Sequence, residues 1–385
     1  MSVRIAGVAS TAFGKHPGSS SRELFSDAAA DAFEDADLGP DAVDALYFGN
    51  FLGNLVEDQG HMGAMMADAV GAREAATMRV ESACASGGAA IRAATHGIEA
   101  GAFDVVLVGG TEVMYAVGTE AITDGLANAA DNEYEDQAGL TFPGIYAAMA
   151  RAYMDEFGAT REDLAAVSVK NHRNGVANPI AQFHEELSVE DVVEAKPIAT
   201  PLGLLDCCPI SDGASAILLV EEAYARENDL DAPVVVRGSG QSSDAIALQD
   251  RADLTRTPAA ERAAAEAYET AGIGPDDVDV FEVHDCFTIA EVFALEALGL
   301  YEHGGGVRGA VEGETDLDGD TPVNTSGGLL AKGHPVGVTG VEQVVELTKQ
   351  LEGRHPNQVE GAGVAVAHNV GGSGASATVH VLGRD

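Results

Sequence analysis

AAADAFEDADLGPDAVD at residues 28–44 and AAAEAYETAGIGPDDVD at residues 263–279 align without a gap, and this internal repeat decides the fold class. In each copy, apolar residues recur at helical spacing and the segment ends in a Gly-Pro turn, which predicts a helix. A short apolar segment follows each copy, ALYFG at 45–49 and VFEVH at 280–284, and predicts a strand that runs into a loop. We therefore expect a chain built from two related halves.

The similarity between the halves continues downstream of the repeat. Residues 84–88, CASGG, open a helix of small residues that leads to the apolar strand 105–110, and GHP at 333–335 opens a helix that leads to the strand 364–368. Alternating strands and helices are typical of α/β architecture, in which helices pack on sheets. The small residues after Cys84 further predict a helix enclosed between two layers.

Residues 115–205 interrupt this alternation with polar, glycine-containing and helical stretches, and we interpret them as an inserted loop domain. No long linker rich in proline, serine and glycine divides the chain, so we expect one assembly of two halves. The N-terminal half then spans residues 1–225, including the loop domain, and the C-terminal half spans residues 226–385.

The charge of the chain is extreme, because 62 acidic residues against 21 basic residues give a formal net charge of −41. Such a surface repels nucleic acids and anionic membranes, which excludes both as partners. At molar salt the Debye length shrinks to roughly 3 Å and makes the self-repulsion tolerable, so the composition indicates a salt-loving source. An acidic tail or interaction module is the alternative, but the carboxylates are spread through helical segments.

The sequence shows neither a membrane span nor a leader pattern. No apolar run approaches the roughly 18–20 residues that a membrane span requires, and the first residues, MSVRIAGV, predict a strand instead of a cleavable leader. We therefore expect a soluble, cytoplasmic protein.

The four cysteines of the chain, at 84, 207, 208 and 286, do not form a disulfide framework, and reduced thiols are expected. No CxxC pair is present, so a structural zinc site is not expected.

Cys84 lies at a predicted strand-to-helix junction, after VESA at 80–83 and before ASGGAAI at 85–91. Unpaired N–H groups and the positive end of a helix dipole stabilise a thiolate, and small neighbours let a substrate approach. The position is therefore typical of a nucleophile. A single cysteine among alanines is also typical of a buried core residue, so the residue alone leaves both interpretations open.

The second candidate is His334 in NTSGGLLAKGHPVG, residues 324–337, a glycine-dense loop with a proline that we expect to start a helix. An imidazole held beside a thiol takes its proton and returns it later, which makes the thiol a nucleophile at neutral pH. An ordinary turn with a surface histidine is the alternative, although the glycine density indicates that the backbone closely approaches another group.

Two further motifs supply imidazole, thiol and backbone groups. HDCF at 284–287 places His284 and Cys286 after the second strand of the repeat, where α/β folds often hold catalytic groups. Zinc ligation is the alternative for this pair, but a second cluster of ligands is missing. HNVGGSG at 368–374 either aims main-chain N–H groups at a developing oxyanion or forms an ordinary turn.

Together, SACASG, HDCF, NTSGGLLAKGHPVG and HNVGGSG occur in the order and content of the thiolase superfamily. The chain resembles the sterol-carrier-protein-2-type thiolases and the archaeal acetyl-CoA acetyltransferases over nearly its whole length. The resemblance implies the thiolase fold, in which two duplicated halves form a five-layered αβαβα core with an inserted loop domain. It also implies a ping-pong reaction through an acyl-cysteine, in which two acetyl-CoA condense to acetoacetyl-CoA and CoA, or a 3-ketoacyl-CoA is cleaved by thiolysis.

The resemblance assigns a role to each motif. Cys84 would accept the acetyl group, with His334 as its base. His284 would bind the thioester oxygen in one oxyanion hole, where many thiolases use the asparagine of an NEAF motif. The main-chain N–H groups of Cys84 and Gly371 would form the other. Asn369 stands where many thiolases carry the cysteine of a C-terminal CxG motif, so the resemblance implies that Cys286 abstracts the α-proton of the second acetyl-CoA.

The resemblance also sets expectations for ligands and partners. Coenzyme A thioesters are the expected substrates, and neither a cofactor nor a metal is expected. Candidate substrate-binding residues are Lys170, His172, Asn369, Arg151 and Arg173. A homodimer or homotetramer is implied, as is a small OB-fold, zinc-containing partner subunit.

Other functions share the fold or the composition. A decarboxylating ketosynthase has the same fold and a Cys/His/His site, although HDCF and KGHP argue against it. Hydroxymethylglutaryl-CoA synthase would need a glutamate base, and none is evident near these motifs. The non-enzymatic alternative is a chain that only binds acyl-CoA, or a scaffold subunit without activity. The sequence leaves the pathway open between mevalonate synthesis, polyester-precursor synthesis and fatty-acid breakdown.

Overall fold

A computed structural model describes residues 2–385, and both copies of the repeat fold as the sequence predicts. The first copy forms helix α1 (Ser21–Asp35), a one-turn 3-10 helix at the Gly-Pro turn, and strand β2 (Ala45–Gly49). The second forms helix α10 (Pro258–Ala271), the same one-turn helix, and strand β9 (Val280–Glu282). In both copies the apolar face of the helix packs on the sheet that contains the following strand.

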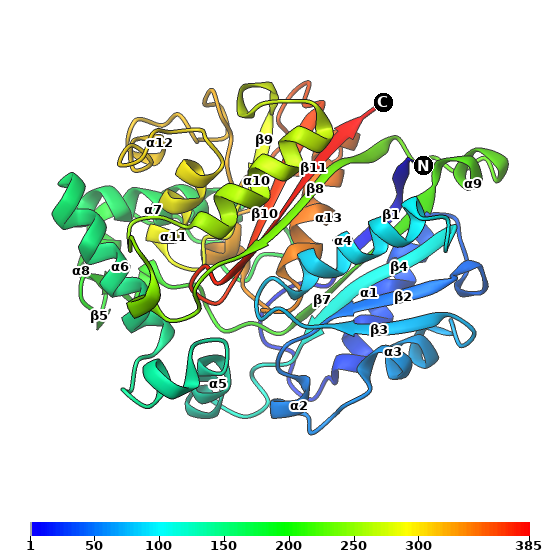
Figure 1. The fold of residues 1–385 in the computed structure, drawn as a ribbon, viewed down its shortest axis with the longest axis horizontal. Helices are drawn as coiled ribbons and strands as arrows, with labels where there is room; N and C mark the ends of the chain where they lie inside the picture. Colours follow the sequence, from blue (N-terminus) through cyan, green and yellow to red (C-terminus); the bar gives the residue numbers. More distant parts are fainter. Residues whose placement is uncertain (1) are drawn as a thin grey trace.

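One mixed sheet of nine strands forms the centre of the molecule. Besides β2 and β9, its strands are β1 (Val3–Ser10), β3 (Ala76–Val80), β4 (Val105–Glu112), β7 (Gly213–Glu221), β8 (Val234–Ser243), β10 (Val364–Gly371) and β11 (Ser376–Arg384). Their order is β3-β2-β4-β7-β1-β8-β11-β10-β9 (Figure 1). The first five belong to the N-terminal half and the last four to the C-terminal half.

The two half-sheets have the same pattern of pairing. In the first, β1, β7 and β4 pair antiparallel and β4 then pairs with β2 in parallel. In the second, β8, β11 and β10 pair antiparallel and β10 then pairs with β9 in parallel. Three antiparallel residue pairs between β1 and β8 join the two half-sheets into one hydrogen-bonded sheet.

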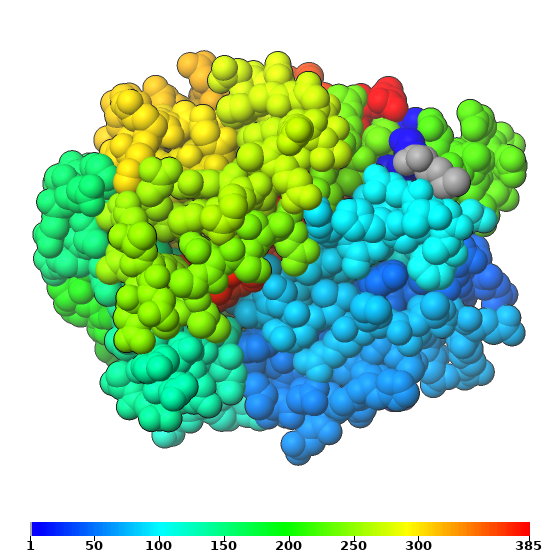
Figure 2. Space-filling view, viewed as in Figure 1, coloured from blue at the N-terminus to red at the C-terminus, as the bar shows by residue number. Residues whose placement is uncertain are grey.

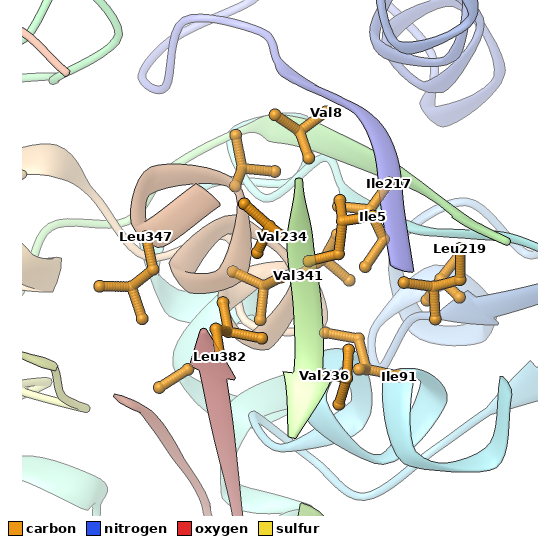
Figure 3. Packing of buried hydrophobic residues seen from close by; sticks show 14 of the residues in the cluster. Ile5, Val8, Ile91, Ile217, Leu219, Val234, Val236, Val341, Leu347 and Leu382 are labelled. Atoms are coloured by element: carbon orange, nitrogen blue, oxygen red, sulfur yellow. The ribbon is translucent and has the colours of Figure 1, made fainter. Parts of the chain in front are cut away.

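Helices separate and cover the half-sheets in five layers. The helices concerned, besides α1 and α10, are α3 (Met62–Val70), α4 (Ser86–Glu99), α11 (Thr288–Ala297) and α13 (Thr339–Glu352). Helices α1 and α3 cover one half-sheet, α10 and α11 cover the other, and α4 and α13 lie between the two. Figure 3 shows this central layer, where Ile91 of α4 and Val341 of α13 pack with Ile5 and Val234. The predicted enclosure of the helix after Cys84 is therefore confirmed.

Glycine is required where α4 meets α13. A side-chain carbon added at Gly340 would lie 2.2 Å from the main-chain nitrogen of Gly88, and one added at Gly87 would lie 2.8 Å from the nitrogen of Val341. Both distances are too short for any side chain. The small residues that follow Cys84 thus allow the two buried helices to touch through their backbones, and they fix the start of α4 against the C-terminal half.

Between β4 and β7 the chain forms a helical insertion, which contains the residues interpreted as a loop domain. Its elements are α5 (Thr119–Ala127), α6 (Phe142–Phe157), α7 (Arg161–Gly175), α8 (Val189–Glu194), β5 (Pro197–Ala199) and β6 (Leu202–Gly203). The insertion packs on α11 of the C-terminal half, through a cluster that includes Tyr146, Met149 and Ile289. In Figure 2 it forms the teal and green left side of the molecule, next to the yellow C-terminal half.

Three short helices complete the fold. They are α2 (Gly53–Val56), α9 (Glu222–Glu227) and α12 (Arg308–Val311). Across residues 2–385, none of the helices combines the length and the apolar character needed to cross a membrane.

Candidate active site

The four motifs singled out in the sequence meet at one cavity of about 340 Å³. Its wall includes Cys84 from the loop before α4, Cys286 from the loop after β9, His334 from the loop before α13, and Gly372 from the β10–β11 hairpin. Most of the remaining lining is apolar and comes from the insertion and from the loops beside it. Residues separated by up to 288 positions are therefore brought together by the duplicated fold.

Cys84 lies between the end of β3 at Val80 and the start of α4 at Ser86, which confirms the predicted strand-to-helix junction. Ala83 has a φ of 49°, in the left-handed region that non-glycine residues rarely adopt. The hydroxyl of Ser86 accepts a hydrogen bond from Ser82 N at 2.9 Å and donates to Ala83 O at 2.6 Å, which holds this turn. Strain of this kind is typical of functional sites.

The thiol of Cys84 is neutral at rest. Burial raises its pKa to about 12, and the nearby carboxylate of Glu112 acts in the same direction. Hydrogen bonds from the main chain of Gly372 and of Cys84 itself lower the pKa in part. Because the thiolate is the nucleophilic form, the site needs a base within reach of the sulfur.

His334 is oriented as that base. Its Nδ1 lies 2.7 Å from the hydroxyl of Thr339, which in turn lies 3.4 Å from the main-chain oxygen of Pro335. Because the hydroxyl donates to that oxygen, it accepts from Nδ1, and we infer that Nε2 carries the lone pair. Burial lowers the pKa of His334 to about 3, so the ring is neutral and able to take a proton at neutral pH.

The helix after His334 begins later than the sequence predicts. Pro335 was expected to start it, but α13 begins at Thr339. The reason is the packing of the intervening Gly337, whose N–H donates to the buried carboxylate of Glu112 at 3.2 Å. A side-chain carbon at Gly337 would also lie 2.7 Å from the Cα of Asn50. This contact with the N-terminal half holds residues 335–338 as a turn before the helix, in which Val338 N donates to Pro335 O at 2.9 Å, and sets His334 beside Cys84.

His284 is held in the opposite tautomer. The side-chain N–H groups of Asn369 donate to His284 Nδ1 at 3.1 Å and to Cys84 O at 3.0 Å, and Asn369 Oδ1 accepts from Gly88 N at 3.4 Å. These contacts fix the orientation of the amide. Since Nδ1 accepts, the proton of the neutral ring is on Nε2, which is buried without a hydrogen-bond partner. Burial, with His334 nearby, lowers the pKa of His284 well below its usual value and keeps the ring neutral.

The geometry of these three side chains bears on metal binding. The thiol of Cys84 and one ring nitrogen each of His284 and His334 lie within 4.8 Å of one another, a spacing that would suit a metal ion. A metal needs a lone pair on each ligand, however, and the hydrogen bond from Asn369 keeps the proton on His284 Nε2. The arrangement suits a base and a hydrogen-bond donor beside a thiol better than three metal ligands.

Cys286 faces the cavity from the loop that carries His284. Burial raises the pKa of its thiol, while a hydrogen bond with Tyr146 acts in the opposite direction. The ring of Tyr146 stacks on Phe287 with centroids 4.5 Å apart, and its hydroxyl donates to Gly372 O at 3.1 Å. Tyr146 is a site residue that the sequence did not reveal, because it belongs to the insertion, where no motif marks its position.

The β10–β11 hairpin places a neighbour of Gly371 beside the thiol. A side-chain carbon at Gly371 would lie 2.4 Å from Ser82 O, so this glycine lets the hairpin pack directly on the Cys84 loop. Gly372 has a φ of 61°, lines the cavity and supplies the main-chain hydrogen bond to Cys84. The main-chain donor next to the thiol thus belongs to Gly372, one residue beyond Gly371, and the role of Gly371 stays a prediction.

Lys170 and His172, which were predicted to bind substrate, are both buried and have structural contacts. Lys170 is 2% exposed, and its ammonium group pairs with Glu291 at 2.6 Å and donates to Val323 O at 3.0 Å. His172 is buried and stacks on Phe183. Neither residue lines the cavity. Of the other candidates, Asn369 orients His284, while Arg151 and Arg173 lie at the surface.

Comparisons with known proteins give the family of the chain. Residues 3–223 match the family model of the thiolase N-terminal domain, and residues 240–384 match that of a thiolase C-terminal domain-like unit. The chain therefore belongs to the thiolase family.

The chain is also similar to individual proteins over most of its length. The chain is 46% identical to an acetyl-CoA acetyltransferase of Methanothermobacter thermautotrophicus, over 89% of this chain and 88% of the relative. It is 36% identical to a benzoylsuccinyl-CoA thiolase subunit of Thauera aromatica, over 89% and 87% of the two chains. Among solved structures, the Ltp2-ChsH2(DUF35) aldolase superposes with a TM-score of 0.86 at 26% identity, covering 100% of this chain and 98% of that one.

Proposed function

We propose that this thiolase is an acetyl-CoA C-acetyltransferase, which condenses two acetyl-CoA to acetoacetyl-CoA and CoA and catalyses the reverse thiolysis. The observation that carries the proposal is the single cavity on which Cys84, His334 and Cys286 meet. A nucleophilic thiol, a base and a second thiol are the groups that the two half-reactions need. The acetyl-CoA acetyltransferase at 46% identity supports the same reaction.

In the first half-reaction, His334 Nε2 takes the proton of Cys84, and the sulfur attacks the thioester carbonyl. The main-chain N–H groups of Cys84 and Gly372 stabilise the oxyanion, and CoA leaves with the proton from His334. In the second, the thiolate form of Cys286 removes the α-proton of another acetyl-CoA, while His284 Nε2–H donates to the enolate oxygen. The enolate carbon attacks the acetyl group on Cys84, and the carbon–sulfur bond breaks to release acetoacetyl-CoA. The Cys84 thiolate then recovers the proton that Cys286 took, which restores both groups for the next cycle.

Acetyl labelling separates the two half-reactions. With radiolabelled acetyl-CoA at high potassium chloride, wild type and Cys286→Ala are expected to become labelled, whereas Cys84→Ala is not. Cys286→Ala is then expected to lack both condensation and acetoacetyl-CoA thiolysis. Full labelling of Cys84→Ala would show that the nucleophile is elsewhere. Release of carbon dioxide from malonyl-acyl carrier protein would instead indicate a decarboxylating ketosynthase.

Two kinds of partner are part of the proposal. A small OB-fold, zinc-containing subunit is supported by the DUF35 component named in the similar aldolase structure.

A homodimer is supported by β3, which forms one edge of the sheet and exposes 53% of Met78. Such an edge can pair with a second copy. Light scattering after chromatography should show a dimer for wild type and a monomer for Met78→Lys. If both proteins were monomeric, the proposed homodimer would be wrong.

A further inference from the structure

All four cysteines of the chain line the catalytic cavity. The proposed reaction uses Cys84 and Cys286. Cys207 and Cys208, which lie between β6 and β7, have no part in it. All four thiols are free in the structure. The otherwise largely apolar wall of the cavity therefore carries two thiols that the proposed reaction does not use.

Cys208 and Cys286 lie opposite each other beside a single antiparallel bridge between two loops. Cys207 and Phe287 form an antiparallel bridge, and Cys208 N donates to Cys286 O at 3.0 Å. In this register the Cα atoms of a directly opposite, hydrogen-bonded pair lie about 5.5 Å apart. Disulfides span Cα distances of about 4.4–6.8 Å, so a pair in this register has the spacing that a disulfide needs.

The side chains of this pair also have the required direction. Directly opposite residues on antiparallel strands project to the same face, and both cysteines line the cavity. The thiol of Cys207 instead donates to Gly203 O at 3.3 Å. Cys208 is half-buried, whereas Cys286 is 5% exposed, so an oxidant that enters the cavity meets Cys208 more readily.

We propose that Cys208 and Cys286 form an oxidative modification site, at which a peroxide converts the two thiols to a disulfide that blocks condensation. The Cys208 thiolate attacks one peroxide oxygen, the O–O bond breaks, and water leaves to give a sulfenic acid. Cys286 then attacks that sulfur, the S–S bond forms and a second water leaves. The thiols lose two electrons and two protons, and the peroxide is reduced to two water molecules.

The consequence for the reaction is specific, and it rests on the role proposed for Cys286. The disulfide consumes the thiol that abstracts the α-proton, while Cys84 remains free to be acylated. Burial raises the pKa of both thiols, so the thiolate fraction is small and oxidation should be faster at alkaline pH. A small thiol reductant reverses the bond by exchange.

The test uses the full chain, first acetylated with acetyl-CoA so that Cys84 is protected, and then treated with hydrogen peroxide. After alkylation of free thiols and digestion, mass spectrometry should find a peptide that joins Cys208 to Cys286. Acetyl groups on Cys84 should persist, thiolysis should fall at least tenfold, and dithiothreitol should restore it. Each variant is compared with its own untreated sample. After peroxide treatment, Cys208→Ser should lose far less of the activity that dithiothreitol can restore. Cys207→Ser should lose as much of it as wild type does.

Two results would overturn the proposal. One is the absence of the Cys208–Cys286 peptide when the oxidant has inactivated the enzyme reversibly. The other is a disulfide that joins either residue to Cys207 or Cys84 instead. If the predicted disulfide forms and thiolysis continues unchanged, the modification site stands, and the role of Cys286 in the proposed function is wrong. The mass spectrum and the activity thus separate the two failures.

Discussion

Asn369 donates a side-chain N–H to Nδ1 of His284 over 3.1 Å, which leaves the proton of that ring on Nε2. Thr339 sets the opposite tautomer on His334, whose ring centroid is 5.0 Å from that of His284. Two neutral imidazoles beside one thiol are therefore chemically different, because one presents a proton and the other a lone pair. Asn369 sets this difference through its hydrogen bond to His284.

The change Asn369→Asp tests this relationship. The carboxylate has the same shape but can only accept, so it draws the proton of His284 to Nδ1 and removes the donor at Nε2. Loss of one oxyanion donor typically lowers the rate by about 10²–10³-fold, and we expect kcat to fall on that scale with little change in KM. Asn228→Asp, on the exposed end of α9, is the matched control and should leave kcat unchanged. An unaltered kcat in Asn369→Asp would contradict the assigned tautomer.

Thr339 should be required for its hydroxyl and not for its size. Thr339→Val keeps the volume but removes the acceptor for His334 Nδ1–H. We expect acetyl transfer to Cys84 to slow by about tenfold or more, because a wrongly oriented or wrongly tautomeric base contributes less to proton transfer. Thr339→Ser restores the hydroxyl and should recover most of the rate. Rapid-quench measurement of the labelling step distinguishes this effect from later steps, and equal rates for the valine and serine variants would refute it.

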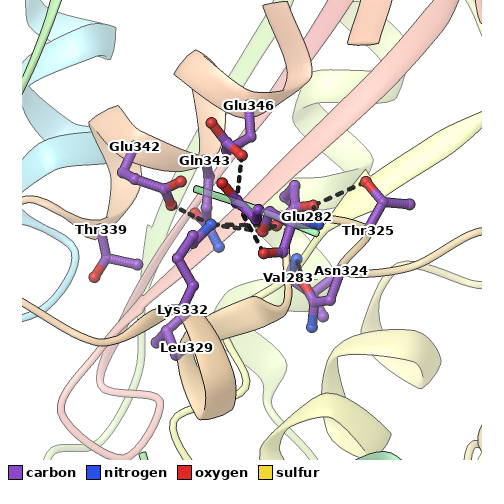
Figure 4. A network of polar contacts seen from close by, with 12 residues as sticks. Glu282, Val283, Asn324, Thr325, Leu329, Lys332, Thr339, Glu342, Gln343 and Glu346 are labelled. Carbon is purple, nitrogen blue, oxygen red and sulfur yellow. Dashed lines mark hydrogen bonds and ion pairs between the residues drawn. The ribbon is translucent and has the colours of Figure 1, made fainter. Parts of the chain in front are cut away.

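Lys332 neutralises carboxylates in the interior next to His334. Its ammonium group lies 2.5 Å from Glu342 and 3.6 Å from Glu282, and all three side chains are at most 1% exposed (Figure 4). Removing one partner of a buried ion pair typically costs about 3–5 kcal/mol. We therefore expect Lys332→Met to lower the free energy of unfolding by roughly that amount in denaturant titrations. Lys349→Met is the control.

Lys349 differs from Lys332 in what its loss leaves behind. Its side chain is 19% exposed, and its partner Glu346 keeps hydrogen bonds from His355 and from Asn178. We expect Lys349→Met to cost about 1 kcal/mol, because its ammonium group is partly exposed to solvent. Equal losses for the two variants would show that neither the exposure of Lys349 nor the hydrogen bonds left to Glu346 reduce the cost.

The sequence predicts the architecture because the repeat carries both helical periodicity and turn chemistry in each copy. It also places Cys84 and His284 correctly at strand ends, since these junctions are local. The contacts of Lys170 could not be predicted, because its partner Glu291 is 121 positions away and nothing local reveals that both are buried. The same holds for the delayed start of α13, which depends on contacts of Gly337 with Glu112 and Asn50. Long-range packing decides such details.

Buried histidines should make the fold sensitive to acid. Burial lowers the pKa of His380 to about 4, against about 6.5 in an unfolded chain. Between these values the unfolded chain binds a proton that the folded chain does not, so the free energy of unfolding falls as the pH falls. His380→Gln removes one such contribution, on the order of 3 kcal/mol between pH 6.5 and 4. Its unfolding free energy should therefore depend less steeply on pH, and an identical slope would contradict the assignment.

The last prediction concerns the net charge of −41, which we propose to be an adaptation to salt. Repulsion among surface carboxylates opposes the compact state, and salt weakens it as the Debye length falls from about 10 Å at 0.1 M to about 3 Å at 1 M. The midpoint of thermal unfolding should therefore rise as potassium chloride increases from 0.1 to 3 M. Because concentrated salt also strengthens burial of apolar surface, screening has to be separated from that effect. A variant with about ten exposed acidic residues changed to their amides should have a higher midpoint than wild type at 0.1 M and a smaller rise with salt. Parallel salt curves for the two proteins would mean that charge repulsion does not set the requirement for salt.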